Sequence, residues 1–292
     1  NFAETSTISR SFPEDQFEKV KPGTIADIHV INTCSVTDIA DRKCRQVIRK
    51  CIKESPGAVI AVIGCYAQLN PGEISSIQGV DLVLGTNEKF EAAAFLERIE
   101  KKKTAEIHSN GLAAPDLFHP SFSIGDRTRS FLKVQDGCDY RCSYCTIPVA
   151  RGRSRNQNIS SLILEAEKIA GKGIKEIVLT GVNIGDYGKS TGDNFASLLR
   201  ELIKVEGIER YRISSIEPNL LTDEIISLAA ECKKILPHFH IPLQSGSDKV
   251  LRLMRRRYRR DQFEERIRFI RKNIPMAGIG ADVIVGFPGE SD

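Results

Sequence analysis

Alternation between short apolar segments and longer helical segments constrains the fold of this chain most. In the N-terminal part, strands are predicted at 28–33, 58–64 and 81–85, and helices at 36–53 and 88–101. Strands that alternate with helices form a parallel sheet connected by crossover helices. The sequence therefore predicts an α/β protein whose first domain, residues 1–103, is a small parallel-sheet domain of the flavodoxin-like kind.

The C-terminal part repeats this alternation. Helical segments separate five further predicted strands, which lie at 131–135, 176–180, 211–215, 239–243 and 280–285. Five successive strand–helix steps are typical of an open or closed β/α barrel. Residues 130–292 are therefore predicted to form a partial TIM-like barrel, and residues 104–129, with several Pro and Gly, a linker.

Composition excludes several classes of protein. Of the 292 residues, 41% are hydrophobic and 27% are charged, as in a globular protein. The sequence has no apolar run of bilayer length and no targeting segment, so we expect a cytoplasmic protein. Because it lacks an N-terminal Met and ends after a Gly-Phe-Pro-Gly-Glu turn, we expect a fragment. Its eight cysteines are predicted to be reduced thiols and metal ligands.

Positive charge is concentrated in one region, although the net charge is only +4. Residues 248–272 contain 11 Lys or Arg and 4 Asp or Glu, and the densest part is 255–260. Clustered arginines can neutralise RNA phosphates, and Tyr258 among them can stack on a base. Alternatively, the arginines form a solvated helix face paired with Asp261, Glu264 and Glu265. The sequence leaves both interpretations open.

Three cysteines follow the first predicted barrel strand at C-x-x-x-C-x-x-C spacing: Cys138, Cys142 and Cys145, with Tyr144 before the last. A cubic iron–sulfur cluster that only carries electrons takes four thiolates, so three leave one iron open for chemistry. A structural zinc site needs a fourth Cys or His, and none follows within 80 residues. The motif resembles that of radical S-adenosylmethionine (SAM) enzymes, which bind SAM at the open iron. These cysteines are the predicted catalytic and cluster-binding residues.

The carboxyl end of each predicted barrel strand carries a distinctive motif. Active sites of parallel α/β folds lie at this end, so these motifs supply the candidates for binding SAM. The glycines allow close approach of a ligand to the backbone, and the polar side chains can hydrogen-bond it. Serines at such places also cap helices or form turns. The predicted cofactor-binding residues are Tyr144, Gly181, Asn183, Ser215, Glu217, Gln244 and Gly286.

Two cysteines of the N-terminal part also end predicted strands. Cys34 and Cys65 follow the first and second strands, so parallel pairing would place them at one edge of the sheet, within reach of one metal centre. A third ligand is expected, because two thiolates do not complete an iron–sulfur site. Cys44, Cys51 and Cys232 are predicted to be small core residues, since free cysteine is commonly buried.

Four segments together resemble the methylthiotransferase family of radical SAM enzymes. They are Asn1-Phe2-Ala3-Glu4-Thr5, Asn32-Thr33-Cys34-Ser35-Val36-Thr37, Gly64-Cys65-Tyr66-Ala67-Gln68 and the three-cysteine motif. The resemblance implies a second, auxiliary 4Fe–4S cluster on three cysteines, two of which are Cys34 and Cys65. The third would lie just upstream of Asn1, so the chain as given is expected to hold this cluster poorly or not at all. A sixth barrel strand and a C-terminal TRAM domain are expected beyond Asp292.

Within the family, residues 142–155 and 180–188 most resemble the branch that acts on threonylcarbamoyl-adenosine next to the tRNA anticodon. The resemblance implies transfer of a methylthio group to carbon 2 of that base. It also implies a tRNA partner, an electron donor such as flavodoxin or ferredoxin, and a monomer. The alternative substrates are isopentenyl-adenosine of tRNA and an aspartate of a ribosomal protein. In another class, the cysteines belong to a non-enzymatic iron–sulfur or zinc module.

Overall fold

The structure, a computed structural model, describes residues 2–35, 37–98, 101, 103–110, 117–125 and 128–291. Its contacts divide the chain into two compact units. The barrel unit comprises the N-terminal residues up to Glu4, Pro120–Pro148 and the residues from Arg153 on, and the sheet unit comprises Thr5–His119 and Val149–Gly152. The change of unit after His119 falls inside the segment predicted as a linker, whereas the limits predicted for the two domains remain predictions.

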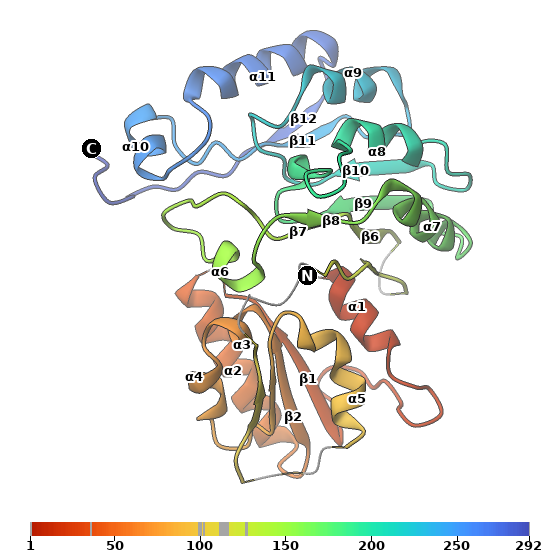
Figure 1. Ribbon diagram of the computed structural model, residues 1–292, viewed down its shortest axis with the longest axis vertical. Helices are drawn as coiled ribbons and strands as arrows, with labels where there is room; N and C mark the ends of the chain where they lie inside the picture. The colour runs from red at the N-terminus through yellow and green to blue at the C-terminus, as the bar shows by residue number, and fades with distance from the viewer. Residues whose placement is uncertain are drawn as a thin grey trace. The chain divides into compact units, whose positions relative to one another are not determined.

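A four-stranded parallel sheet forms the centre of the sheet unit (Figure 1), and it confirms the parallel arrangement predicted for this part. The strands lie side by side in the order β1 (Ile28–Thr33), β2 (Val59–Gly64), β3 (Leu82–Leu84) and β4 (Glu106–His108). The helices of this part of the chain are α1 (Phe2–Arg10), α2 (Asp38–Glu54), α3 (Cys65–Leu69), α4 (Pro71–Ser75), the 3₁₀ helix η1 (Glu88–Glu91) and α5 (Ala92–Leu96).

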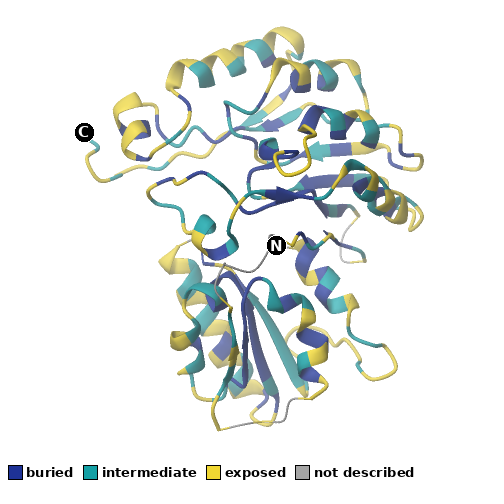
Figure 2. Ribbon diagram, viewed as in Figure 1, coloured by how far each residue is buried: buried dark blue, intermediate teal, exposed yellow. Residues whose placement is uncertain are grey.

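Helices cover both faces of this sheet (Figure 1), and in Figure 2 the strand β2 is dark because it is buried, whereas the edge strand β1 is mostly half-buried. In β2, Ile60 and Val62 belong to one apolar core that includes residues of α2, α3 and α4. Ala61 and Ile63 belong to a second core that includes residues of α1 and α5. A strand buried on both faces needs a continuous apolar run rather than an alternating one, and β2 has such a run.

Five parallel strands form an arc in the barrel unit, which confirms the predicted partial β/α barrel. Parallel bridges from Tyr211 to Ile235 and from Ser215 to His240 link its two hydrogen-bonded groups. The antiparallel strand β5 (Ser121–Phe122) lies beside the first of them. The five strands are β6 (Ser130–Lys133), β9 (Glu176–Thr180), β10 (Arg210–Ile213), β11 (His238–His240) and β12 (Gly278–Gly280).

Helices between these strands bury a single large core. Three of them begin with a side chain that accepts a hydrogen bond from a backbone amide of the first turn: Asn158, Asn194 and Thr222. Such caps fix where a helix starts. The helices are α6 (Ile147–Arg151), α7 (Ile159–Ala170), the 3₁₀ helix η2 (Ile184–Asp186), α8 (Phe195–Leu202), α9 (Asp223–Glu231), α10 (Asp248–Leu253) and α11 (Arg260–Asn273). No helix in the described parts of the chain has the length and apolar character needed to cross a membrane.

The structure differs from the sequence predictions where elements are short. The predicted linker contains β4 and β5, which pair with neighbouring strands despite their short length. The helix predicted at 88–101 is a 3₁₀ turn followed by the short α5, and residues 99 and 100 lie outside the described residues. The last strand, predicted at 280–285, is β12, which ends at Gly280.

Candidate functional site

The three-cysteine loop follows β6 and the short strand β7 (Gln135–Asp136). Cys142 is only 8% exposed, and Cys138 and Cys145 are partly buried. The Cys145 amide donates to the Cys142 carbonyl at 3.1 Å, which closes a tight turn. The Tyr140 amide lies 3.4 Å from the Cys138 sulfur. The three thiols therefore belong to one compact loop at the carboxyl end of the first barrel strand.

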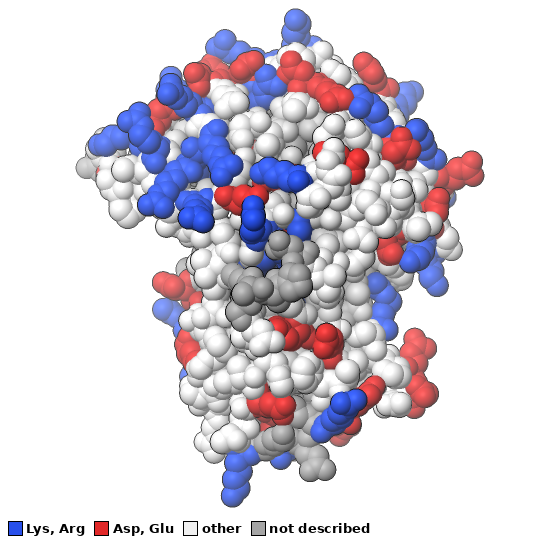
Figure 3. Space-filling model, in the orientation of Figure 1, with Lys and Arg blue, Asp and Glu red and all other residues white. Residues whose placement is uncertain are grey.

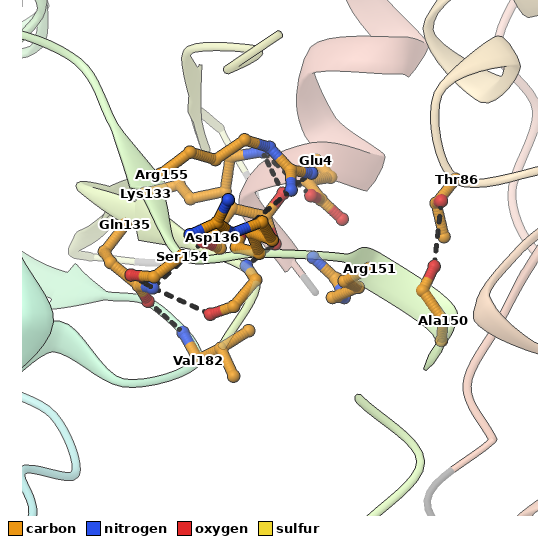
Figure 4. A network of polar contacts seen from close by, with 12 residues as sticks. Glu4, Thr86, Lys133, Gln135, Asp136, Ala150, Arg151, Ser154, Arg155 and Val182 are labelled. Carbon is orange, nitrogen blue, oxygen red and sulfur yellow. Dashed lines mark hydrogen bonds and ion pairs between the residues drawn. The ribbon is translucent and has the colours of Figure 1, made fainter. Parts of the chain in front are cut away.

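A buried charge network fixes the start of this loop (Figure 4). Asp136 accepts the Gly137 amide at 2.9 Å and forms ion pairs with Lys133 at 3.4 Å and Arg155 at 3.2 Å. Lys133 also pairs with Glu4 at 2.9 Å. None of these four charged side chains is more than 8% exposed. Buried charges are tolerated only when they are paired, so Asp136 holds the chain firmly two residues before Cys138.

Burial makes the loop thiols weak acids. It raises the pKa of Cys138 to about 11 and also raises the pKa of Cys145, and the charge of Cys142 acts in the same direction on both. Several thiolates are therefore stable together only when a cationic group balances their charge. Binding of a metal centre here would release protons.

Arg256 brings a cation to this loop. Its side chain is 4% exposed. Nη1 lies 3.1 Å from the Cys142 sulfur and 3.2 Å from the Tyr144 hydroxyl. Nη2 forms an ion pair with Glu217, and Nε donates to the Tyr258 hydroxyl at 3.2 Å. One guanidinium thus connects the cysteine loop to the segment after β10.

The turn that carries Arg256 also contacts the loop through its backbone. Ser143 donates its amide to the Met254 carbonyl at 3.1 Å and its hydroxyl to the Leu253 carbonyl at 3.0 Å, although Ser143 and Leu253 are 110 positions apart. The Arg257 guanidinium lies 4.1 Å from the centre of the Tyr140 ring. The turn after α10 is therefore part of the cysteine site.

One prediction for the basic run is wrong. Tyr258 is 4% exposed, and its hydroxyl donates to the Pro242 carbonyl at 2.7 Å. The ring is packed inside the protein and is not available to stack on a base. Sequence alone does not distinguish an inward Tyr from an outward one in a short loop between two helices.

Three of the predicted cofactor-binding residues lie in polar contacts at this end of the barrel. Ser215 forms a 2.6 Å hydrogen bond with His240 Nδ1, and His240 Nε2 lies 3.3 Å from Asp282. Burial raises the pKa of Glu217, although Arg256 opposes the shift. Burial raises the pKa of Tyr144 to about 12, so its hydroxyl stays neutral. These groups offer donors and acceptors close to the cysteine loop.

Gln135 of β7 holds the backbone directly after Gly181. The Gln135 side-chain oxygen accepts the amides of Val182 at 3.0 Å and Asn183 at 2.8 Å. A Cβ on Gly181 would lie 2.8 Å from a methyl of Ile184 and 3.0 Å from the Gln135 carbonyl. Close packing within the protein is therefore sufficient to explain why position 181 is a glycine. Asn183 is 4% exposed and donates to Asp186 at 3.1 Å.

Gln244 and Gly286 have unusual backbone conformations. Their φ angles are 62° and 75°, in the left-handed region that favours glycine. The Gly286 amide donates to Glu290 at 2.7 Å, and a Cβ there would meet nothing within 4 Å. The turn therefore requires glycine at 286 and leaves open space beside it, which is compatible with the predicted approach of a ring. The cofactor-binding roles of these residues remain predictions.

In the sheet unit, Cys34 and Cys65 directly follow β1 and β2. The last residues of these strands, Thr33 and Gly64, are register partners, so both cysteines leave the same edge of the sheet. Partial burial and the neighbouring Cys65 raise the pKa of Cys34, as expected for two thiols that lie close together. Their role as metal ligands remains a prediction.

Arg151 belongs to the same unit and accompanies these thiols. Its Nε lies 3.3 Å from the Cys65 sulfur. The preceding residue is fixed, because the Thr86 hydroxyl donates to the Ala150 carbonyl at 3.0 Å (Figure 4). Asn1, next to which the third thiol was expected, lies outside the described residues.

The other cysteines are packing residues. Cys44 and Cys51 lie against the core that includes α2, and Cys232 lies against the barrel core. This confirms the packing interpretation for all three. Cys44 has one additional contact, since its sulfur lies 3.6 Å from the Cys34 carbonyl.

Comparison with known proteins identifies the family. Residues 132–292 match the Radical SAM superfamily, and residues 1–85 match the Uncharacterized protein family UPF0004. Threonylcarbamoyladenosine tRNA methylthiotransferase MtaB of Aquifex aeolicus (strain VF5) is 40% identical over 100% of this chain and 72% of its own length. The chain belongs to the radical SAM methylthiotransferase family.

Other methylthiotransferases named MtaB are similar. The protein of Bacillus subtilis (strain 168) is 44% identical over 100% of this chain and 66% of its own length, and that of Thermotoga maritima is 38% identical over 95% and 64%. The chain thus spans about two thirds of these relatives. Among solved structures, the radical SAM methyltransferase TsrM from Kitasatospora setae has a TM-score of 0.57 at 16% identity, covering 89% of this chain and 58% of that one. This likeness supports the fold alone.

Members of the radical SAM superfamily use SAM and a 4Fe–4S cluster, and the cysteine loop fits such a cluster. It offers three thiols, one of which lies beside a cation. No three His, Cys, Asp or Glu side chains of the described residues converge to hold a single metal ion. A cubic cluster differs in this respect, because each thiolate binds a different iron.

Three residues beside the cysteines are not among the site residues predicted from the sequence: Gln135 and Arg256 in the barrel unit, and Arg151 in the sheet unit. Gln135 is an uncharged residue at the end of a strand, and no motif marks it. Arg256 belongs to the basic run for which the sequence left two interpretations open, because composition does not show which arginine of a run points inward. Arg151, six positions after Cys145, had one available signal, which is its place directly after the cysteine motif.

Proposed function

We propose that this protein is a tRNA methylthiotransferase. It transfers a methylthio group, by radical SAM chemistry, to carbon 2 of threonylcarbamoyl-adenosine next to the tRNA anticodon. One observation carries this assignment: four relatives named for threonylcarbamoyladenosine are 36–44% identical and match 91–100% of this chain. Relatives named for the dimethylallyladenosine reaction are 33–38% identical, and the two highest identities, 44% and 40%, belong to relatives named for threonylcarbamoyladenosine.

The barrel unit holds the residues for SAM cleavage. Cys138, Cys142 and Cys145 bind the 4Fe–4S cluster, and the cluster and SAM, when bound, supply the radical that activates the target carbon. Arg256 balances the thiolate charge and holds the loop, while Glu217 orients Arg256. The protein works as a monomer with an electron donor such as flavodoxin or ferredoxin.

The sheet unit holds the auxiliary 4Fe–4S cluster in this proposal. Cys34 and Cys65 are two of its ligands, and a thiol from the chain before Asn1 is the third. The common sheet edge of the two cysteines and the cation of Arg151 beside Cys65 support this assignment. The enzyme acts in the cytoplasm, where tRNA is modified.

Three alternatives to this proposal remain. Two are methylthiotransferases with another substrate, and the third is a protein that is not an enzyme. The same chemistry on isopentenyl-adenosine of tRNA is favoured by the dimethylallyladenosine relatives at up to 38% identity. An aspartate of a ribosomal protein is the second alternative. A non-enzymatic iron–sulfur or zinc module would leave the polar groups at the strand ends without a role.

The nucleoside profile of tRNA from a gene-deletion strain tests the proposal. We expect loss of the methylthio group from threonylcarbamoyl-adenosine alone, restored by the wild-type gene and not by Cys142→Ala. Loss from the isopentenyl derivative would reassign the substrate. Unchanged tRNA together with loss of sulfur from a ribosomal protein would refute a tRNA substrate. If the protein binds zinc after anaerobic reconstitution and does not cleave SAM, the assignment as a radical SAM enzyme is refuted.

A further inference from the structure

The arginines at the end of the barrel unit fall into two groups. Arg266 and Arg268 of α11 have acidic partners: Arg268 pairs with Glu264 at 2.5 Å, and Arg266 pairs with Glu265 at 2.8 Å. The second group, which we call the unpaired arginine patch, is exposed to solvent. No ion pair joins its members to any described residue. It consists of Arg252, Arg255, Arg259 and Arg260.

The acids beside this patch are engaged elsewhere. Asp248 accepts the backbone amide of Arg260 at 2.8 Å, and Asp261 accepts the amide of Gln262 at 2.7 Å. Glu264 and Glu265 pair with arginines of α11. The interpretation that the basic run is neutralised by Asp261, Glu264 and Glu265 is therefore wrong for these four arginines.

The patch is local and is mounted on a rigid turn. Lys and Arg side chains gather over α10 and the turn that follows it (Figure 3). Residues 248–272 carry a net charge of +7, whereas the rest of the chain sums to −3. Arg255 has a φ angle of 58°, and the buried Tyr258 fixes the turn from inside. A fixed backbone loses little conformational entropy on binding, so the entropic cost is confined to the arginine side chains.

Unpaired, exposed guanidinium groups at this spacing suit a polyanion. Arginine binds phosphate oxygens through two parallel hydrogen bonds, and each phosphate that is neutralised releases counterions. An open hollow of ≈ 840 Å³ adjoins the patch. Arg257, Arg259 and Gln262 line it as donors, and the carboxylates of Asp261 and Glu265 line it as well. Its donors add polar contacts beside the charged ones.

We propose that the unpaired arginine patch binds the phosphate backbone of the RNA substrate. This inference rests on the proposed function and assigns the surface that function requires. The turn that carries the patch also contacts the cysteine loop, through Met254 and Arg256. RNA bound at the patch is therefore held next to the site where SAM is cleaved.

Binding of purified tRNA to the reconstituted protein over a range of salt concentrations tests this inference. We expect the double variant Arg255→Gln/Arg259→Gln to bind at least about tenfold more weakly. The slope of log affinity against log salt should become shallower by roughly 1.5, which corresponds to the loss of two phosphate contacts. The matched control, Arg200→Gln/Arg268→Gln, removes the same charge from two exposed arginines that have acidic partners.

The outcomes separate this inference from the proposed function. If the patch variant loses affinity and slope while the control and SAM cleavage without RNA are unchanged, the inference is supported. If the wild type binds tRNA and both double variants bind it as tightly as the wild type, the patch is not the RNA surface. The same conclusion follows if both variants lose the same amount of affinity. In either case the proposed function stands. A wild-type protein that binds no tRNA overturns both.

Discussion

At the scale of single residues, Arg256 concentrates several tasks in one side chain. Its guanidinium donates to a sulfur, two hydroxyls and a carboxylate while almost completely buried. Only a planar group with five donors can satisfy so many partners in different directions. The outward arginines beside it have no such partners, so neighbours in one short run have opposite roles.

Replacing Arg256 should therefore be costly. Arg256→Gln leaves Glu217 buried without its cation, and we expect the free energy of unfolding to fall by about 3–5 kcal/mol. Denaturant unfolding of the cluster-free protein measures this. Arg256→Gln/Glu217→Gln should recover part of the loss, and the exposed Arg268→Gln should change stability by less than about 0.5 kcal/mol. Equal losses for Arg256→Gln and Arg268→Gln would contradict the role described for the buried pair.

Gly181 separates a packing role from a ligand role. Gly181→Ala would force a Cβ against Ile184 and the Gln135 carbonyl, so we expect a loss of about 1–3 kcal/mol in unfolding free energy. Gly246→Ala, where a Cβ meets nothing within 4 Å, is the control and should be nearly neutral. Normal stability of Gly181→Ala combined with weakened SAM binding, measured by calorimetry, would instead favour the ligand role predicted from sequence.

At the scale of elements, burial decided which predictions succeeded. The strands predicted at 28–33 and 176–180 have the bounds of β1 and β9. For β9 the reason is burial, because its three apolar residues are buried between polar residues at both ends. The helix α1 was missed, since Thr5, Ser6 and Thr7 are poor helix formers. Its stability comes from tertiary contacts, such as burial of Ile8 and the ion pair of Glu4, which sequence periodicity does not report.

Gln135 shows how strongly one residue of a two-residue strand can stabilise the folded protein. It is fully buried, and its side chain donates to the carbonyls of Asp136 and Gly137 and accepts two amides. Gln135→Leu keeps the size but leaves these groups unpaired, so we expect a loss of about 3 kcal/mol or more. Thermal unfolding measures it. Gln157→Leu, a partly exposed site, is the control, and an equal effect of the two changes would refute the argument.

At the scale of the whole molecule, the chain carries two sets of thiols, one in each unit. Sequence predicted both sets because strand ends and cysteine spacing are local features. It did not predict the cations beside them, Arg151 and Arg256, since Arg256 lies more than a hundred positions from its sulfur. Contacts between distant segments depend on how the fold closes, and no local pattern encodes them.

The two sets of thiols should be separable by mutation. Cys142→Ala should abolish formation of 5′-deoxyadenosine from SAM. Cys65→Ala should leave that cleavage intact and abolish methylthio transfer to tRNA, because it acts in the other unit. Chromatography of both products measures the two activities, and Cys232→Ala, a core change, should retain both. Loss of SAM cleavage in Cys65→Ala would show that the two sets are not independent.

The turn after α10 also limits how members of this family can diverge. Its inner side contacts the cysteine loop through Leu253, Met254 and Arg256, and its outer side presents Arg255 and Arg259 to solvent. If this turn is replaced by that of a relative with another RNA preference, the residues that contact the cysteine loop change together with the exposed arginines. A chimeric enzyme therefore needs residues 138–145 and 252–260 from the same protein, and the two segments should be exchanged together.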